Sequence, residues 1–320
     1  MPQKIAILDT GYESYDYEKK LFKEAGYDLE IFTGERHDRA GKIALAKDAV
    51  GLLVRWTKIN DDFLQATPKL KAIVRYGVGY DNIDLDAATR YGVKVANVRG
   101  YANHSVSDHA LALIYACARG LSQGQKLVEQ QFAKPPIREI IELHDKTLGI
   151  IGLGRIGGTL CQKAQPLFKK ILASDPYISD ERFSSLGASK TNLDDLLRDS
   201  DIISVHCNLT EETRGLIDKN KMQLMRKSAI IINTARGPVI NEDDLYEALQ
   251  SGKLHSVGLD VYGEEPPSSR QERLLFHPQV IATGHYAWYS TKSIVELQKR
   301  ATHNLLTMLQ GEIPEDCLNF

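Results

Sequence analysis

The sequence predicts an α/β protein of two domains, each built on a parallel β-sheet. Its 320 residues exceed what one hydrophobic core usually serves. Short apolar runs alternate along the chain with amphipathic helical patterns, an order that favours parallel strands joined by helices. The expected strands cover residues 4–8, 29–32, 51–54, 72–74, 93–97, 147–151, 170–174, 201–206, 229–233, 256–260 and 280–282.

Helical patterns fill the intervals between these strands. The clearest cover residues 17–25, 103–119, 192–198, 241–251 and 291–310. The second of them is apolar on nearly every side, so we expect a deeply buried helix or one in a subunit interface, crossing between the domains. Gly120 follows it where a glycine favours a helix end.

Charge and composition narrow the class of protein. The formal net charge of −2 gives no reason to expect nucleic acid or an anionic membrane as the partner. No apolar run approaches the length of a membrane span, and the first residues read as a strand, not a signal peptide. The four cysteines form no CxxC pair, so we expect reduced thiols, no metal site and a cytoplasmic protein.

A glycine-rich turn, Gly152-Leu-Gly-Arg-Ile-Gly157, links the strand at 147–151 to a helical pattern. Asp175 lies eighteen residues after Gly157, at the end of the next strand. In this context the glycines allow a tight turn, close approach of a pyrophosphate and close helix–strand packing. An acid at Asp175 would accept hydrogen bonds from a ribose and repel a 2′-phosphate, which favours NAD over NADP. A glycine turn without a ligand is the alternative.

Three ionisable side chains follow three later strands. Arg236, Glu265 and His285 come after the strands at 229–233, 256–260 and 280–282. The carboxyl ends of parallel strands share one edge of the sheet, where ligands bind. Taken alone, each of these residues could equally be an ordinary surface or capping residue. Together they offer a guanidinium for a substrate carboxylate, a proton donor, and a carboxylate that favours the protonated imidazole.

A second glycine-containing loop, Arg75-Tyr-Gly-Val-Gly79, follows the strand at 72–74 in the first domain. Exposed amides of Val78 and Gly79 would suit a carboxylate. A plain turn between a strand and a helix is an equal alternative when the loop is judged without its neighbours.

These segments together resemble the D-isomer-specific, NAD-dependent 2-hydroxyacid dehydrogenase family over nearly the whole chain. Residues 287–290 and the loop beginning at Arg75 resemble its C-terminal-binding-protein branch. The resemblance implies two Rossmann-like domains flanking a cleft. A dinucleotide-binding domain at 99–287 would be inserted in a substrate-binding, flavodoxin-like domain at 1–98 plus 288–320. It also implies a homodimer built on the helix at 103–119.

The resemblance further implies roles for individual residues. Arg236 would bind and polarise a 2-oxo acid, His285 would be the acid/base, and Glu265 would pair with it. The expected cofactor contacts are Gly152, Gly154, Arg155, Ile156, Gly157, Asp175, His206, Thr213, Thr234, Ala235, Asp260 and Val106. The expected substrate contacts are Arg75, Tyr76, Gly77, Val78, Gly79 and Trp288, with Trp56 facing the same cleft. Gly284 and Asn208 stand where the family usually has proline.

The predicted activity is the reversible reduction of a 2-oxo acid to the D-2-hydroxy acid with NADH. The alternative is an NAD(H)-sensing interaction protein of the corepressor type, with incidental turnover. A dehydrogenase for phosphorylated substrates would need a further basic cluster in the cleft, and the sequence alone does not locate one. The sequence also leaves the identity of the 2-oxo acid open.

Overall fold

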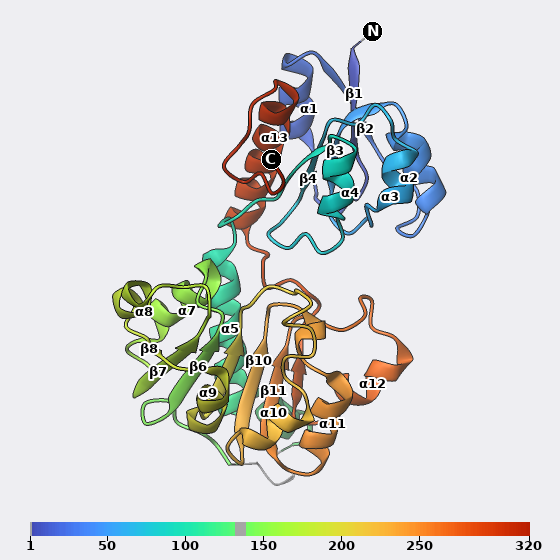
Figure 1. Ribbon diagram of the computed structural model, residues 1–320. Helices are drawn as coiled ribbons and strands as arrows, with labels where there is room; N and C mark the ends of the chain where they lie inside the picture. The colour runs from blue at the N-terminus through green and yellow to red at the C-terminus, as the bar shows by residue number, and fades with distance from the viewer. Residues whose placement is uncertain (1, 132–138) are drawn as a thin grey trace. The chain divides into compact units, whose positions relative to one another are not determined.

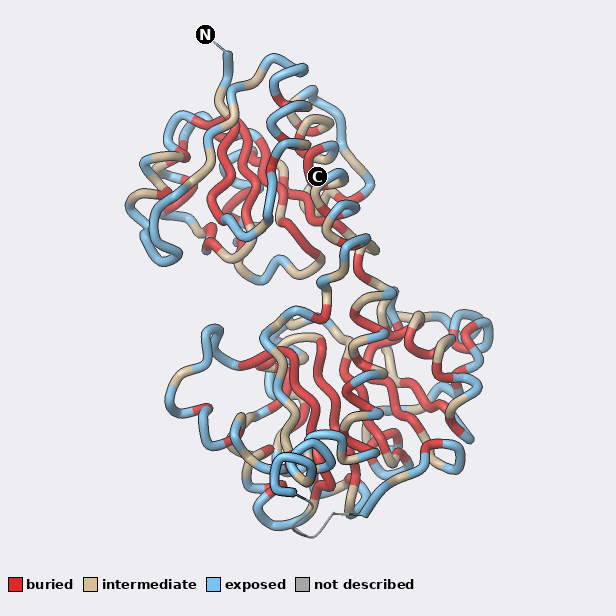
Figure 2. Tube along the Cα trace, turned by 180° about the vertical axis from the view of Figure 1, so that it is seen from behind, coloured by how far each residue is buried: buried red, intermediate tan, exposed pale blue. Residues whose placement is uncertain are grey.

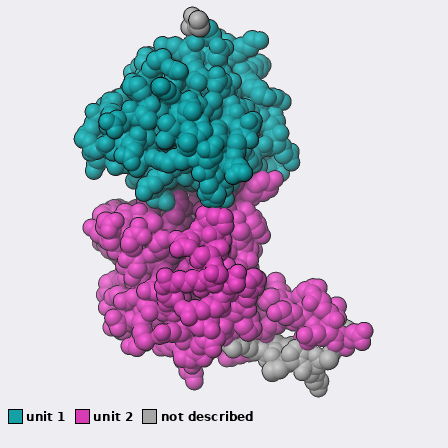
Figure 3. Space-filling view, turned by 90° about the vertical axis from the view of Figure 1, so that its right-hand side faces the viewer, with its two compact units in different colours: residues 1–101, 290–320 teal, residues 102–289 magenta. Residues whose placement is uncertain are grey.

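The computed structural model describes residues 2–131 and 139–320 and forms two compact units, coloured separately in Figure 3. Unit 1 comprises Met1–Tyr101 and Ser290–Phe320, and unit 2 comprises Ala102–Tyr289. One unit is therefore inserted in the sequence of the other.

Unit 1 holds a five-stranded parallel sheet in the order β2-β1-β3-β4-β5 (Figure 1). Its strands are β1 Gln3–Ile7, β2 Tyr27–Ile31, β3 Ala49–Val54, β4 Ala72–Arg75 and β5 Lys94–Ala96. Its helices are α1 Asp16–Glu24, α2 Arg39–Ala46, α3 Asp61–Gln65, α4 Leu85–Arg90 and α13 Thr291–Leu309. The strand order changes direction between β1 and β3. Ligand sites in such sheets lie beyond the carboxyl ends of the strands at that point.

The helix α13 brings the C-terminal part of the chain back onto unit 1. It packs against α1, β3 and β4. Its buried residues include Leu297, Ala301, Leu305 and Met308, whose spacing of three and four residues places them on one face of the helix. Ser290 begins the helix by accepting a hydrogen bond from the Ser293 amide through its hydroxyl.

Unit 2 holds a seven-stranded parallel sheet in the order β12-β11-β10-β9-β6-β7-β8. Its strands are β6 Thr147–Ile151, β7 Lys170–Ser174, β8 Ser189–Lys190, β9 Ile202–Val205, β10 Ala229–Asn233, β11 Leu254–Leu259 and β12 Val280–Ala282. Its helices are α5 Asn103–Ala118, α6 Leu121–Glu129, α7 Arg155–Ala164, α8 Asp180–Leu186, α9 Leu193–Asp199, α10 Lys219–Leu224, the 3-10 helix η1 Gly237–Val239, α11 Glu242–Gln250 and α12 Ser269–Leu275. Two parallel-sheet α/β units confirm the predicted fold class, and Figure 2 shows the buried strands in both.

The helix α5 lies wholly within unit 2, so the prediction of a helix crossing between the domains was wrong. It packs against α7, β10 and β11 and buries Val106, Ala110 and Leu113. Gly120 adopts a left-handed conformation with φ of 60° directly after it, in keeping with the predicted helix end. Among the residues that the structure describes, no helix is long and apolar enough to cross a membrane.

Candidate active site

The glycine turn of unit 2 lies where the strand order of its sheet reverses, between β6 and β9. Gly152 has φ of 90°, and a Cβ there would lie 2.6 Å from the Cys207 amide nitrogen. A Cβ at Gly157 would lie 2.0 Å from the Gly152 carbonyl oxygen, whereas at Gly154 no atom lies within 4 Å. The first and third glycines therefore permit close backbone packing, and the second leaves open space in front of α7.

Asp175 follows β7, and its side chain is hydrogen-bonded to the glycine turn. Its Oδ2 accepts a hydrogen bond of 2.8 Å from the Leu153 amide, and its Oδ1 accepts one of 3.0 Å from the Tyr177 amide. The carboxylate is therefore held beside the glycine turn by two backbone donors.

Arg236 lies in a loop directly after β10. The Asn233 side chain accepts a hydrogen bond from the Ala235 amide and donates one of 2.9 Å to the Arg236 carbonyl, so it holds the backbone on both sides. The Arg236 Nη1 donates a hydrogen bond of 2.8 Å to the Ala235 carbonyl. A Cβ at Gly237 would lie 1.9 Å from the Tyr262 carbonyl carbon, so this loop packs tightly against the loop after β11.

Glu265 and His285 form a short contact at the same edge of the sheet. The Glu265 Oε2 lies 2.5 Å from the His285 Nδ1, and its Oε1 accepts a hydrogen bond from the Tyr262 amide. Burial alone would raise the pKa of Glu265. The opposing effects are larger: His285 contributes a hydrogen bond and a charge, the Tyr262 amide donates a hydrogen bond, and Arg236 adds a positive charge. The pKa of Glu265 therefore lies below its ordinary value. The carboxylate is thus ionised near neutral pH and favours a protonated imidazole.

His285 has φ of 53°, a left-handed conformation that a residue with a side chain rarely adopts. Such a conformation costs about 1–3 kcal/mol and persists only where its surroundings hold it. Here the Trp288 Nε1 donates a hydrogen bond of 3.0 Å to the His285 carbonyl.

Asp260, at the end of β11, holds the rest of the His285 loop. The side chain is only 1% exposed. Its Oδ1 accepts hydrogen bonds from the Thr283 hydroxyl at 2.6 Å and the Tyr286 amide at 3.1 Å, and its Oδ2 accepts one from the Ala287 amide at 2.9 Å. His109 of α5 supports the same group, with Nε2 2.9 Å from the Thr283 hydroxyl oxygen. Sequence reasoning did not select His109, because nothing in a helical segment shows which carboxylate it will meet.

The other unit 2 residues predicted to contact the cofactor differ in whether their polar groups already have hydrogen-bond partners. The His206 ring lies 2.8 Å from the Ser204 hydroxyl oxygen, and burial lowers the pKa of His206 to about 4, so the ring is neutral near pH 7. The Thr213 hydroxyl donates a hydrogen bond to the Asn208 carbonyl. The Thr234 hydroxyl is buried, and within the described residues it has no hydrogen-bond partner. Val106 is 6% exposed in the first turn of α5.

The glycine loop of unit 1 lies beyond β4. Gly77 has φ of 139°, and the Asn97 side chain donates a hydrogen bond of 2.6 Å to the Val78 carbonyl. In the described part of the chain, neither the Val78 nor the Gly79 amide donates a hydrogen bond. The Tyr76 side chain is buried and donates to Glu18, so the ring supports the loop from within unit 1.

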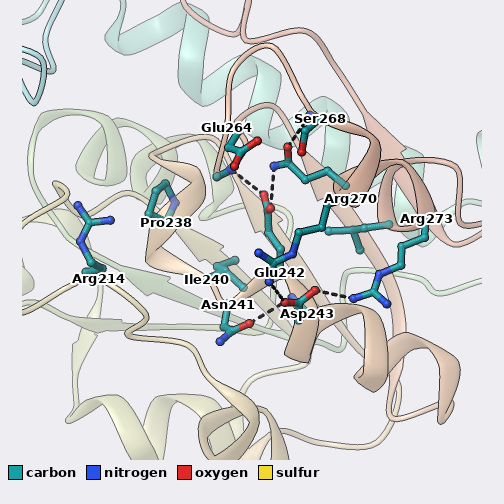
Figure 4. Close-up of a pocket in the computed structure, with 13 residues that line it drawn as sticks. Arg214, Pro238, Ile240, Asn241, Glu242, Asp243, Glu264, Ser268, Arg270 and Arg273 are labelled. Atoms are coloured by element: carbon teal, nitrogen blue, oxygen red, sulfur yellow. Dashed lines mark hydrogen bonds and ion pairs between the residues drawn. The ribbon is translucent and has the colours of Figure 1, made fainter. Parts of the chain in front are cut away.

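A polar pocket of unit 2 lies between α11, α12 and the loop that carries Glu264 (Figure 4). None of the predicted catalytic residues lines it. Asp243 is ion-paired with Arg270 and Arg273, and Glu242 accepts hydrogen bonds from the Gly263 amide and the Gln271 side chain. The charged groups of this pocket therefore largely satisfy one another.

Comparison with known proteins assigns this geometry to a family. Residues 111–287 match the D-isomer specific 2-hydroxyacid dehydrogenase, NAD binding domain. The chain is 38% identical over 99% of its length to the D-3-phosphoglycerate dehydrogenase of Methanocaldococcus jannaschii. The chain belongs to the D-isomer specific 2-hydroxyacid dehydrogenases.

Other relatives of this chain differ in the substrates that their names give. It is 34% identical to a glyoxylate reductase of Korarchaeum cryptofilum, over 82% of this chain and 80% of that protein. A solved structure of D-lactate dehydrogenase from Aquifex aeolicus, complexed with NAD and lactic acid, superposes with a TM-score of 0.88 at 27% identity over 96% of each chain. The chain spans only 56% and 59% of two phosphoglycerate dehydrogenases that it matches.

The chain binds NAD, as predicted, and the glycine turn fits this cofactor. The open space at Gly154 allows a pyrophosphate to approach the backbone, and the N-terminus of α7 presents amide N–H groups to it. The unsatisfied Thr234 hydroxyl, directly after β10 at the same edge of this sheet, is a further polar group that a ligand would satisfy.

Proposed function

We propose that this chain catalyses the reversible, NAD-dependent reduction of a 2-oxo acid to the D-2-hydroxy acid. The observation that carries the proposal is the short Glu265–His285 contact together with Arg236, all on loops at the carboxyl edge of one parallel sheet. Family membership supports the reaction class, and the named relatives act on different 2-oxo or 2-hydroxy acids. The interaction-protein alternative has no comparable observation in its favour.

In this proposal the chain's own residues orient the substrate and move one proton. When bound, NADH supplies the hydride that adds to the 2-oxo carbon. Arg236 pairs with the substrate carboxylate and polarises the ketone oxygen, where negative charge develops. Because the His285 Nδ1 faces Glu265, the proton for that oxygen comes from Nε2. In the oxidation direction the neutral ring takes the proton back.

The other predicted contacts complete the proposal. The free amides of Val78 and Gly79 would bind the substrate carboxylate, with Arg75, Tyr76 and Gly77 shaping their loop. Trp288 would line the substrate site. The predicted cofactor residues, Asp175 included, would hold NAD in preference to NADP because the Asp175 carboxylate repels a 2′-phosphate. A cytoplasmic homodimer belongs to the same proposal. The four cysteines are free thiols in the structure, which fits a reducing compartment.

The test is turnover of NADH with glyoxylate, pyruvate, hydroxypyruvate and phenylpyruvate by the wild type and by Arg236 variants. Loss of a charge-assisted contact at Arg236→Ala should cost about 3 kcal/mol, on the order of a hundredfold in kcat/KM. Arg236→Lys should rescue only part of this, since a point charge does not reproduce the planar fork. Arg226→Ala is the control, because that arginine pairs with Asp201 at the opposite edge of the sheet. Near-normal turnover by Arg236→Ala would place the arginine outside the site.

A further inference from the structure

Two loops of unit 2 are joined across the carboxyl end of β6, where the glycine turn begins. The sheet order places β6 between β9 and β7. The loop after β7 carries Asp175 and Tyr177, and the loop after β9 carries Glu212. The Tyr177 hydroxyl donates a hydrogen bond of 2.7 Å to the Glu212 Oε2. This contact therefore links loops from the strands on the two sides of β6, at the end of the sheet where the dinucleotide turn lies.

Tyr177 makes a hydrogen bond at each end of its length. Its amide donates to the Asp175 Oδ1 at 3.0 Å, and its hydroxyl donates to Glu212. The side chain is 79% exposed, so burial does not account for its position. The hydrogen bond and charge of Glu212, followed by desolvation and the charge of Asp175, raise the pKa of the Tyr177 hydroxyl. The two carboxylates are thus separated by a single tyrosine side chain, and both act on its hydroxyl.

The loop that carries Glu212 has hydrogen bonds of its own. The Thr213 hydroxyl donates to the Asn208 carbonyl at 2.6 Å and accepts a hydrogen bond of 2.8 Å from the Thr210 amide. The Thr213 amide donates in turn to the Thr210 carbonyl at 3.2 Å. These contacts do not involve Tyr177. We therefore expect the loop to keep its conformation when the Tyr177–Glu212 hydrogen bond is removed.

The charges of Asp175 and Glu212 are not neutralised by a basic side chain. Within residues 2–131 and 139–320, no lysine, arginine or histidine lies within ion-pair distance of either carboxylate. Asp175 is the acid expected to accept hydrogen bonds from the adenosine ribose. A ribose hydroxyl is neutral and donates to such an acceptor, whereas a 2′-phosphate is negatively charged and is repelled by each carboxylate in its vicinity.

We propose that Glu212, hydrogen-bonded to Tyr177, is a second determinant of cofactor choice, which acts with Asp175 to select the 2′-hydroxyl of NAD against the 2′-phosphate of NADP. Asp175 supplies the negative charge beside the ribose, and Glu212 adds another at the far end of the Tyr177 side chain. The inference rests on the NAD preference proposed above for Asp175. The glycine motif does not indicate Glu212, because it identifies only the acid at the end of the second strand.

The proposal is tested by fluorescence titration with NADH and NADPH in the absence of any 2-oxo acid. The measured quantity is the ratio of the NADPH Kd to the NADH Kd. This ratio should exceed one in the wild type, and Glu212→Gln should lower it by about threefold or more, mainly through tighter NADPH binding. Tyr177→Phe keeps the charge of Glu212 but removes the hydrogen bond that positions it, so the ratio should fall by a smaller factor.

Glu211→Gln is the matched control. It removes the same charge from the adjacent exposed residue, which makes no side-chain hydrogen bond or ion pair within the described residues, so the ratio should stay at the wild-type value. Salt provides a second readout that a purely structural role would not change. The Debye length falls from about 30 Å at 0.01 M to about 3 Å at 1 M ionic strength, so the effect of Glu212→Gln should shrink over that range.

Three results would overturn the proposal: an unchanged ratio in Glu212→Gln, an equal change in Glu211→Gln, or an equal loss of affinity for both cofactors in Glu212→Gln. The wild-type ratio distinguishes this failure from that of the proposed NAD preference. If the wild type binds NADPH more tightly than NADH, the role proposed for Asp175 fails too. If the wild type prefers NADH and Glu212→Gln leaves the ratio unchanged, the role of Asp175 stands and only that of Glu212 fails.

Discussion

Because Glu265 contacts His285, substitution of this one residue should change the pH dependence of the proposed reaction. The ionised Glu265 favours the protonated His285, which the reduction requires at its start. Glu265→Gln removes this negative charge, and with it a stabilising partner of the protonated ring. We therefore expect the reductive rate to fall at lower pH than in the wild type, and the oxidative rate to rise at lower pH.

The measurement is a pair of pH–rate profiles, with NADH affinity followed by fluorescence. NADH affinity should change little, since the ring serves proton transfer. Glu264→Gln is the matched control, because Glu264 is an exposed carboxylate in the same loop. If the profiles of Glu265→Gln and the wild type coincide, Glu265 does not tune the histidine.

Asp260 offers a second test at this scale, because two roles for it predict different results. The family resemblance makes it a cofactor contact, whereas its hydrogen bonds to Thr283, Tyr286 and Ala287 make it the support of the His285 loop. Asp260→Asn replaces one acceptor oxygen with a donor and weakens hydrogen bonds to a charged group, each worth about 1.5–3 kcal/mol. If Asp260 supports the loop, the Asp260→Asn variant should show a kcat lower by tenfold or more and a Tm lower by several degrees, with nearly constant NADH affinity. A large loss of NADH affinity with an unchanged Tm would favour the cofactor contact instead.

At the scale of elements, two glycines of the turn between β6 and α7 have different roles: Gly157 permits close packing, and Gly154 leaves space for the cofactor. Alanine at Gly157 places a Cβ against the Gly152 carbonyl, and such overpacking costs about 1–3 kcal/mol. Alanine at Gly154 enters open space, where the pyrophosphate would lie. We expect Gly157→Ala to lower Tm by several degrees. Gly154→Ala should keep the wild-type Tm and bind NADH at least tenfold more weakly. Calorimetry measures the Tm of the two variants, and fluorescence titration measures their NADH affinity. Equal losses of Tm in Gly157→Ala and Gly154→Ala would contradict this prediction.

The strands and the glycine turn were predictable because their signals are local. Buried parallel strands are unbroken apolar runs, as in β3 and β10, and the glycines act within a single turn. The two-residue edge strand β8 is too short and too exposed to give such a signal. Arg236, Glu265 and His285 were predictable as a set, because strand ends of a parallel sheet share one edge.

The supporting contacts were not predictable from the sequence. His109 beside Asp260, and Glu212 beside Tyr177, depend on how segments far apart in the chain pack together. The same holds for Asp9, which meets the backbone of the loop after β3 some 46 residues away. The predicted course of α5 was wrong for a related reason. An apolar helix shows that it will be buried, but not which unit will bury it.

At the scale of the whole molecule, unit 2 exposes an apolar surface around α5 and α6. Tyr115, Leu121, Val128 and Ile140 are 38%, 59%, 57% and 37% exposed. Leu121 and Val128 are seven residues apart on α6 and so share one face of that helix. The Cδ1 of Ile140 would lie 3.2 Å from a Cβ at Gly120, which places it beside the start of α6. No residue of α6 is buried within the single chain.

An amphipathic helix whose apolar residues stay exposed is more stable when a second copy covers them, and a twofold axis lets one patch cover itself. We therefore expect a homodimer at micromolar concentration, built on α5 and α6. Leu121→Glu with Val128→Glu should give monomers by sedimentation velocity while keeping the wild-type circular dichroism, because neither side chain contributes to the core of its own unit. Phe276→Glu, at the exposed end of α12 and 82% exposed, is the control that should stay dimeric. A wild type that sediments as a monomer, or a double variant that remains a dimer, would place any subunit interface elsewhere. A monomer that still reduces 2-oxo acids would show that the Arg236, Glu265 and His285 set needs no partner subunit, since all three residues belong to one chain.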